Sequence, residues 1–252
     1  MKSILKVLLL SCVTSLAYAS GGGDVHLDHV DVDIRDKPSM QRGAAMFTNY
    51  CMGCHSLKYS RYERVADDIG IPHNLYEENL IFGDAKIGQL MDIAMAPSMA
   101  KGWFGAAPPD LTLISRLRGP NWLYSYLRGF YKDESRPWGV NNVVFKDVGM
   151  PHVLVGLQGL CAEKPELGSK AGIDPLSGVV VGAPGCKSFA TTGSMEPQEY
   201  DAAIRDMVNF LAYVGEPSRL ESEEIAPFVL LFLVILFVPA YLLNREYWKD
   251  VH

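Results

Sequence analysis

The sequence has no excess of positive charge. Its 23 lysines and arginines are outnumbered by 29 aspartates and glutamates, which gives a net charge of −6 over 252 residues. An acidic surface does not suit the phosphate backbone, so we expect no nucleic acid among the partners. The same charge suits a basic soluble partner, whose approach an acidic surface speeds at low salt.

Cysteine and histidine are also scarce, at 5 and 6 residues, and no second CxxC or HxxxH pair exists to complete a zinc site. One run stands out, Cys51-Met52-Gly53-Cys54-His55. The pattern CxxCH is typical of covalent attachment of a c-type haem. Each thiol adds to one vinyl group of the porphyrin, and the adjacent histidine is an axial ligand of the iron. A cytosolic redox dithiol is excluded by the export signal described next.

Residues 1–19 are predicted to form an export signal that is cleaved off. Lys2 and Lys6 precede an apolar stretch at residues 7–16, and Ala17-Tyr18-Ala19 is a small-x-small cleavage site. The alternative, a first membrane anchor, is disfavoured because the apolar stretch is too short to span a bilayer comfortably. We therefore expect an exported domain over residues 20–218, with a net charge of −8 once the two lysines are removed.

The C-terminal part contains an uncharged run at residues 225–243. As a helix these 19 residues span about 29 Å, which matches the hydrocarbon thickness of a bilayer. We expect a single transmembrane anchor with its flanks at residues 219–246. Pro227 is expected in the first turn, where proline is tolerated, and Pro239 can kink the last turns.

The signal fixes the orientation of this anchor, because it exports everything that precedes the anchor. The domain then faces the outside of the membrane, and residues 247–252 form a short cytoplasmic tail. Arg245 and Lys249 after the anchor, against Arg219 before it, agree weakly with this orientation.

Two cysteines, Cys161 and Cys186, lie outside both the haem motif and the signal peptide. The exported compartment is oxidising, so this even pair is expected to form a disulfide. The disulfide would close a loop rich in glycine, proline, serine and charged residues. It is expected to stabilise the folded protein by about 3 kcal/mol.

The remaining pattern is mainly helical. Asp36-Lys37-Pro38-Ser39 favours a helix start, with the helix running through residues 40–49 into the haem motif. Further helices are expected at residues 87–95, from Leu111 after a cap at Asp110, at 121–131 after the break at Gly119-Pro120, and at 196–213. No sustained strand alternation occurs, and only residues 179–181 favour a short strand.

A haem that only transfers electrons needs a second axial ligand. The candidates are Met150, Met195 and His152. Methionine is a soft thioether ligand that raises the reduction potential. The spacing alone does not choose between Met150 and Met195, since any methionine can also be core packing.

The chain resembles the cytochrome c1 family, the haem subunit of ubiquinol–cytochrome c reductase, in its bacterial form. The residues that carry the resemblance are Cys-Met-Gly-Cys-His-Ser-Leu-Lys-Tyr-Ser-Arg-Tyr from Cys51, Ala-Pro-Pro-Asp-Leu-Thr from Ala107, Asn-Asn-Val-Val-Phe-Lys-Asp-Val-Gly-Met-Pro-His-Val-Leu from Asn141, and Gly193-Ser194-Met195. The implied fold is mainly α: a cytochrome c-like haem domain with loop insertions and one C-terminal transmembrane helix.

The resemblance assigns roles by position. It implies one covalent haem c held by Cys51 and Cys54, with His55 and Met195 as the axial ligands of the iron. Arg118 matches an arginine that pairs with a haem propionate, a contact that suits its planar donors, and Arg116 is its rival. Pro109, Ile114 and Leu127 match apolar walls of the haem pocket. Trp103 stands where some relatives have an asparagine that reaches a propionate.

The implied function is one-electron transfer from a Rieske iron–sulfur protein to a c-type cytochrome. Cytochrome b would lie beside the anchor in a dimeric complex, and quinol oxidation would take place on other subunits. Two alternatives remain open: an independent membrane-tethered electron shuttle, and a haem enzyme with an open distal site.

Overall fold

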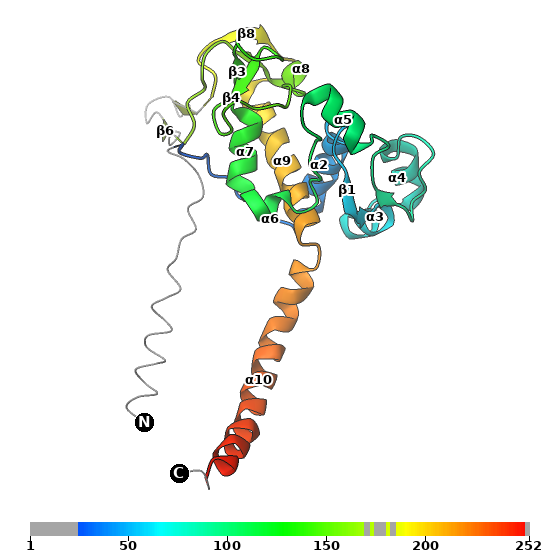
Figure 1. Ribbon diagram of the computed structural model, residues 1–252, viewed down its shortest axis with the longest axis vertical. Coiled ribbons are helices and arrows are strands. Elements are labelled where there is room, and N and C mark those ends of the chain that lie inside the picture. Colours follow the sequence, from blue (N-terminus) through cyan, green and yellow to red (C-terminus); the bar gives the residue numbers. More distant parts are fainter. Residues whose placement is uncertain (1–24, 169–171, 174–179, 182–184, 250–252) are drawn as a thin grey trace.

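The computed structural model describes residues 25–168, 172–173, 180–181 and 185–249. The expected signal peptide and the residues that follow it to 24 lie outside the described residues, as does the tail from 250 on. The described part is mainly helical, with short strands and long connections. Figure 1 shows a helical domain from which one long helix projects.

Two helices form the centre of the domain. Helix α2 (Lys37–Tyr50) packs against α9 (Pro197–Gly215), with the rings of Phe47 and Phe210 5.9 Å apart. A Cβ added at Gly43 would lie 2.2 Å from the main-chain oxygen of Asp206. Glycine at this position is therefore what lets the two helices approach so closely.

Helix α2 begins where the sequence predicted. The carboxylate of Asp36 accepts a hydrogen bond from the main-chain N–H of Ser39 at 3.1 Å, and Pro38 lies in the first turn. This cap satisfies one of the donors that a helix start leaves free. The helix ends at Tyr50, so Cys51 is its C-cap residue and the haem motif follows directly.

Helix α9 confirms the helix expected at residues 196–213. Its side chains Ile204, Met207, Val208 and Leu211 are all buried, as the spacing i, i+3, i+4, i+7 requires for one face of a helix. Pro197 occupies the first turn, where its missing N–H costs nothing. The helix thus forms one wall of the core that also contains the haem motif.

The segment after the haem motif differs from the prediction. Residues 87–95 do not form a helix; they contain the short strand β2 (Leu90–Met91), which pairs antiparallel with β1 (Leu57–Arg61). The helices here are α3 (Tyr62–Ile69) and α4 (His73–Leu80). The predicted helix was wrong because Leu90 and Met91 meet β1, a partner about 30 residues away that helical periodicity does not reveal.

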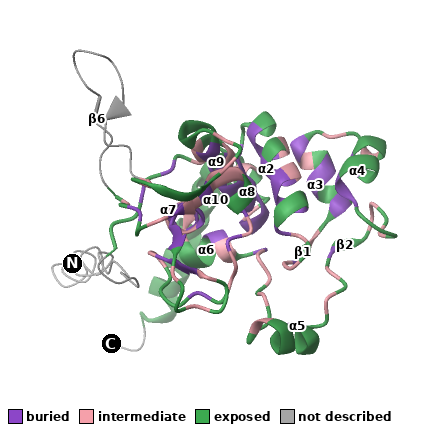
Figure 2. Ribbon diagram, turned by 90° about the horizontal axis from the view of Figure 1, so that it is seen from above, coloured by how far each residue is buried: buried purple, intermediate pink, exposed green. Residues whose placement is uncertain are grey.

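Of the next three helices, the first was not predicted, and the other two begin and end near their predicted positions. Helix α5 (Pro97–Phe104) is set apart from the other helices and is reached by two extended segments, as Figure 2 shows. Helix α6 (Ile114–Arg118) begins three residues after Leu111, and α7 (Pro120–Arg128) ends three residues before the expected Tyr131. Asp110 still accepts a hydrogen bond from the N–H of Thr112 at 3.1 Å.

A four-stranded sheet covers one end of the domain and was not predicted. Its order is β4-β3-β5-β8, and the short helix α8 (Val155–Gln158) precedes β5. The strand bounds are β3 (Phe130–Lys132), β4 (Val140–Asn142), β5 (Gly159–Cys161) and β8 (Phe189–Thr192). Strands of three or four residues are too short to show alternation in the sequence.

A small pair, β6 (Gly172–Ile173) and β7 (Val180–Val181), lies in the disulfide loop. The predicted strand at residues 179–181 is confirmed for the last two of these; residue 179 lies outside the described residues.

The C-terminal helix α10 (Arg219–Tyr247) contains the expected anchor. It is long and apolar enough to cross a membrane, and its most apolar window packs against none of the described domain. The helix begins six residues before the uncharged run, so Pro227 lies inside the helix and not in its first turn, which corrects the prediction. Helical interiors in membranes tolerate proline where neighbouring groups satisfy the freed carbonyl.

Candidate functional site

The CxxCH motif forms one tight turn that continues α2. The main-chain N–H groups of Cys54 and His55 both donate to the carbonyl oxygen of Cys51, at 3.0 and 2.9 Å. Residues three and four positions apart on such a turn lie on the same side. The structure therefore places the two thiols and the imidazole together, as covalent attachment of one porphyrin requires.

The imidazole of His55 is fixed by a main-chain oxygen. Its Nδ1 lies 2.7 Å from the carbonyl oxygen of Pro109. A carbonyl can only accept, so Nδ1 carries the proton and Nε2 keeps its lone pair. Burial is the main cause that lowers the pKa of His55. A neutral imidazole with a free Nε2 and a bonded Nδ1 is the form that ligates a metal.

The two motif thiols differ in their surroundings. Cys51 is buried, with its Sγ 3.9 Å from the Sδ of Met207 on α9, while Cys54 is partly exposed. Burial raises the pKa of the Cys51 thiol to about 12. Both cysteines are outside any disulfide in the described structure, so both are free to form thioether bonds.

The segment after the motif is tied to residues 109–112 by several hydrogen bonds. Besides the His55–Pro109 bond, the N–H of Leu111 donates to the oxygen of Ser56 at 2.9 Å. The carboxylate of Asp110 accepts from the N–H of Lys58 at 2.8 Å and from that of Thr112. The sequence predicted Asp110 only as a helix cap and Pro109 only as an apolar wall. It did not reveal that the Pro109 carbonyl orients the histidine or that Asp110 ties the two segments together.

The structure separates the candidates for the second axial ligand. Met195 packs against the large core cluster that contains Cys51 and Leu127. Met150 packs instead against a second cluster, and its Sδ accepts from the hydroxyl of Tyr126 at 3.3 Å. Of the two methionines, only Met195 shares its cluster with the haem motif.

His152 is held in a different environment. Its Nε2 donates to the oxygen of Gly159 at 3.1 Å, and its ring stacks on Phe130 with the centroids 4.7 Å apart. Burial lowers the pKa of His152 to about 4. Because its Nε2 already has a partner in the sheet, His152 is a packed core histidine of this region.

The segment that carries Met195 is pinned by its main chain. The N–H of Ser194 donates to the oxygen of Gly156 at 3.0 Å, and the N–H of Met195 donates to that of Leu157 at 3.1 Å. A Cβ added at Gly193 would lie 2.1 Å from the oxygen of Leu157. The close approach at Gly193 and the two hydrogen bonds hold the thioether segment in place before α9 begins.

The two arginines of α6 have different partners. Arg116 Nη1 lies 3.7 Å from the carboxylate of Glu216. Arg118 lies over the ring of Trp122, with its Cζ 5.1 Å from the centroid, and pairs with no carboxylate in the described part of the chain. Arg118 is thus the arginine whose charge is available to a propionate.

The expected wall residues occupy three different positions. Leu127 is buried on α7, and Ile114 is partly buried on α6 against the same core cluster. Pro109 is exposed and contributes its carbonyl, as described above. Trp103 on α5 is 58% exposed and contacts Phe104, with the ring centroids 6.4 Å apart, so the structure does not bring it to the core.

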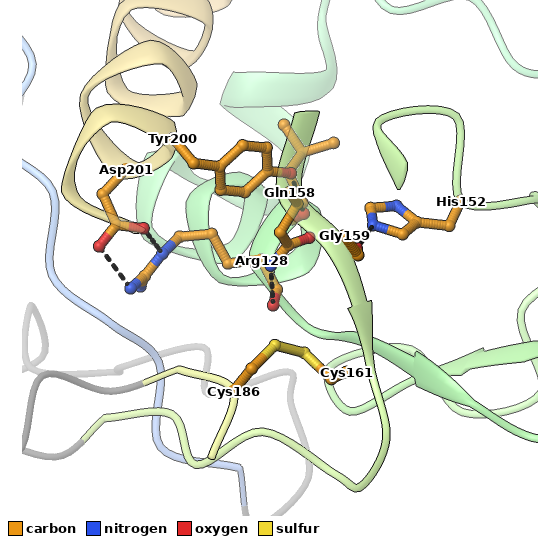
Figure 3. The surroundings of a disulfide bond; sticks show 9 residues. Arg128, His152, Gln158, Gly159, Cys161, Cys186, Tyr200 and Asp201 are labelled. Atoms are coloured by element: carbon orange, nitrogen blue, oxygen red, sulfur yellow. Dashed lines mark hydrogen bonds and ion pairs between the residues drawn. A yellow bond between two sulfur atoms is a disulfide. The ribbon is translucent and has the colours of Figure 1, made fainter. Parts of the chain in front are cut away.

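Cys161 and Cys186 form a disulfide with their Cα atoms 5.2 Å apart. Cys161 is the last residue of β5. Figure 3 shows the disulfide together with Arg128 and Asp201, which belong to a buried charge cluster that the sequence did not reveal. In this cluster Arg128 forms two hydrogen bonds with Asp201, at 2.6 and 2.9 Å, and a third contact with Asp28. Asp28 also accepts from the N–H of Gly168 at 2.6 Å.

The donor set fits a covalently attached haem. Two thiols on one side of a turn, an imidazole with a fixed free Nε2, and a thioether in the same core cluster are together what such a group requires.

Comparison with known proteins agrees with this fit. Residues 31–158 match the family model described as "Cytochrome C1 family". The chain is 52% identical to "Cytochrome c1" of Allochromatium vinosum over 100% of this chain and 99% of the relative. It is 40% identical to "Ammonia monooxygenase gamma subunit" of Nitrosomonas europaea over 99% of both, and 26% identical to "Cytochrome c1" of Rhodospirillum rubrum over 86% of this chain and 83% of the relative.

Among solved structures, a chain of "Hyperthermophilic respiratory Complex III" aligns with a TM-score of 0.42 and 15% identity, over 100% of this chain and 98% of that chain.

Proposed function

The chain belongs to the cytochrome c1 family, and from this premise we propose that it passes single electrons from a Rieske iron–sulfur protein to a c-type cytochrome. The family is that of the membrane-anchored haem subunit of respiratory complex III, which binds haem c covalently. The bound haem c supplies a one-electron redox centre. Since the sequence contains one CxxCH motif, we propose one haem.

One observation carries this proposal: the hydrogen bond from His55 Nδ1 to the oxygen of Pro109, at 2.7 Å. It fixes the ring orientation and leaves Nε2 as the proximal ligand. We propose Met195 as the second ligand, because it shares the core cluster of the haem motif and its main chain is pinned. Two protein ligands leave no open position for a substrate, which suits electron transfer.

The protein residues around this site would change little between oxidation states. Cys51 and Cys54 hold the group covalently, and the bonds to Pro109 and Leu157 keep both ligand-bearing segments fixed. Ile114 and Leu127 exclude water from the core side. We propose that Arg118 pairs with a propionate, since a guanidinium matches a carboxylate in geometry and charge.

The anchor and the charge support the expected surroundings. Complex III membership implies cytochrome b and a Rieske protein as partners. We propose that α10 places the domain on the periplasmic side, with the C-terminus in the cytoplasm, and that the complex is dimeric. The acidic net charge suits a basic c-type cytochrome as the acceptor. Quinol oxidation would take place on the other subunits, so this chain is a non-catalytic subunit of an oxidoreductase.

Co-purification and quinol reduction test the proposal. The full chain is extracted in mild detergent, and its haem is followed after quinol is added. We expect cytochrome b and the Rieske protein to elute with it, and reduction to require the Rieske protein. An independent shuttle would elute alone. A haem enzyme with an open distal site would bind carbon monoxide.

A further inference from the structure

A groove of about 460 Å³ lies where four elements meet at the end of the domain that leads into α10. Strand β1, strand β2, helix α3 and the C-terminal turn of α9 contribute its walls, and Pro217 of the α9–α10 connection closes one side. Its volume is in the range of small-ligand sites. None of the residues assigned to the haem site lines it.

The polar side of the groove is basic. Lys58, Arg61 and Arg64 line it, and the lining contains no aspartate or glutamate. Of the three, Arg64 is paired with Asp68 at 2.6 Å and lies 3.5 Å from Glu221. This groove is a local positive site on a protein whose net charge is −6.

Two of these charges are not neutralised by a carboxylate in the described structure. Arg61 Nη1 donates to the main-chain oxygen of Gly88 at 2.7 Å, and Lys58 Nζ lies 5.2 Å from the centroid of the Tyr59 ring. Both side chains are exposed at the groove. An anion in the groove would therefore meet two cations that do not have to leave an ion pair first.

The groove lies beside the start of α10, close to where the lipid headgroups around this helix would end. Pro217 precedes the start of α10 at Arg219 by two residues, and the uncharged run begins at residue 225. Six residues of helix rise about 9 Å, and the headgroup region on each side of a bilayer is roughly 5–8 Å thick. A phosphate group of the leaflet on the domain side is within reach of the groove.

The rest of the lining is mixed. Tyr59, Ser60 and Tyr213 add hydroxyl groups, and an apolar side is formed by Val65, Leu90, Val214 and Pro217. A groove with a basic side and an apolar side matches a phosphate ester joined to a glycerol and acyl chains. We propose that this groove binds the headgroup of one anionic phospholipid of the adjacent leaflet, with Lys58 and Arg61 as the phosphate-binding residues. This proposal rests on the membrane anchor of the proposed function, but not on electron transfer.

Lipid retention measured by native mass spectrometry tests the proposal. The full-length, haem-loaded protein in non-ionic detergent is titrated with phosphatidylglycerol and, separately, with phosphatidylcholine of the same acyl chains. We expect one phosphatidylglycerol to be retained at concentrations where phosphatidylcholine is not. Each charge removed should weaken retention about fivefold, so Lys58→Gln with Arg61→Gln should weaken it roughly 25-fold.

The matched control is Arg35→Gln with Arg219→Gln. These two arginines also lie at the start of α10, where both contact Glu223, but they do not line the groove. Retention in this control should equal that of the unmodified chain. Lys58→Gln alone leaves the Arg61–Gly88 hydrogen bond intact and should show the single fivefold loss.

Three results would overturn the proposal: equal retention of the two lipids, an equal loss in the control, or no loss in the groove variants. Displacement of the lipid by glycerol phosphate at equal concentration would assign the groove to a soluble anion instead. A subunit of the complex that is lost only in the groove variants would assign it to a protein. The haem spectrum of each sample reports separately on the proposed function.

Discussion

His55 Nδ1 lies 2.7 Å from the carbonyl oxygen of Pro109, and this contact joins two segments more than fifty residues apart in the chain. Neighbouring hydrogen bonds, from Leu111 to Ser56 and from Lys58 to Asp110, continue the same junction. The haem motif is therefore oriented by main-chain contacts, and side-chain substitution at Pro109 alone cannot remove the accepting oxygen.

Replacing Met195 with leucine should lower the reduction potential of the haem and open the iron to carbon monoxide. A thioether favours the ferrous state, and axial ligands shift haem potentials within a range of roughly 0.8 V. The measurement is a redox titration with a carbon monoxide spectrum. Met150→Leu is the matched control. It should change neither the reduction potential nor carbon monoxide binding, because Met150 packs against the second cluster. An unchanged spectrum in Met195→Leu would remove it as a ligand.

Replacing Arg118 with glutamine should also lower the potential, by less than the loss of Met195. A propionate that loses its cation is an uncompensated negative charge near the iron, which disfavours the electron-rich state. The control is Arg116→Gln, whose side chain faces Glu216. If the control shifts the potential and Arg118→Gln does not, the roles of the two arginines are reversed.

Removing the Cys161–Cys186 disulfide should destabilise the protein by about 3 kcal/mol, since the bond closes a loop with a sequence separation of 25. The double variant with both cysteines replaced by serine avoids a lone thiol. Denaturant unfolding measures the change, with the haem spectrum as a check on the site. If the variant and the unmodified protein unfold at the same denaturant concentration under non-reducing conditions, the disulfide contributes nothing to stability.

Stability should fall as the pH drops from about 6.5 to about 4, in part because of His152. Its pKa is lowered to about 4 in the folded protein by burial, against 6.5 for the ordinary side chain. The unfolded chain therefore binds more protons in this window, and the contribution of His152 is present above it and lost below it, by up to about 3 kcal/mol. His152→Gln should flatten the pH profile of the unfolding midpoint; a profile parallel to that of the unmodified chain would contradict this.

Replacing Arg128 with methionine should cost about 3–5 kcal/mol, because Asp28 and Asp201 would keep buried charge without their cation. Asp201 already has a raised pKa, mainly through burial. The loss should therefore be larger at neutral than at acid pH, where the Asp201 carboxylate becomes protonated. The control Arg219→Met removes an exposed pair and should change stability by no more than about 1 kcal/mol.

Local signals made much of this fold predictable. The cap at Asp36, the stripe on α9, the CxxCH turn and the uncharged anchor each depend on residues close together in the chain. Strand β5 depends on partners far away, since it pairs with β3 in parallel and with β8 antiparallel. Such strands have no pattern of their own, and the same lack of a local signal led to a helix being predicted where β2 pairs with β1.

The residues that would hold the haem could be predicted from the sequence, but the contacts that orient them could not. The motif indicated Cys51, Cys54 and His55, and the resemblance supplied Met195. The hydrogen bonds at Pro109 and at Met195 use main-chain atoms of segments that meet only in the fold. Neither composition nor motif spacing reveals such contacts. The Arg128 cluster is equally non-local, because its carboxylates come from residues 28 and 201.

The central claim is that His55 and Met195 fill both axial positions of one covalent haem. A reduced-minus-oxidised spectrum of the purified protein, repeated under carbon monoxide, tests it most directly. The account predicts a low-spin c-type spectrum that carbon monoxide leaves unchanged. Binding of carbon monoxide by the folded protein would contradict it, because it would show an open position at the iron.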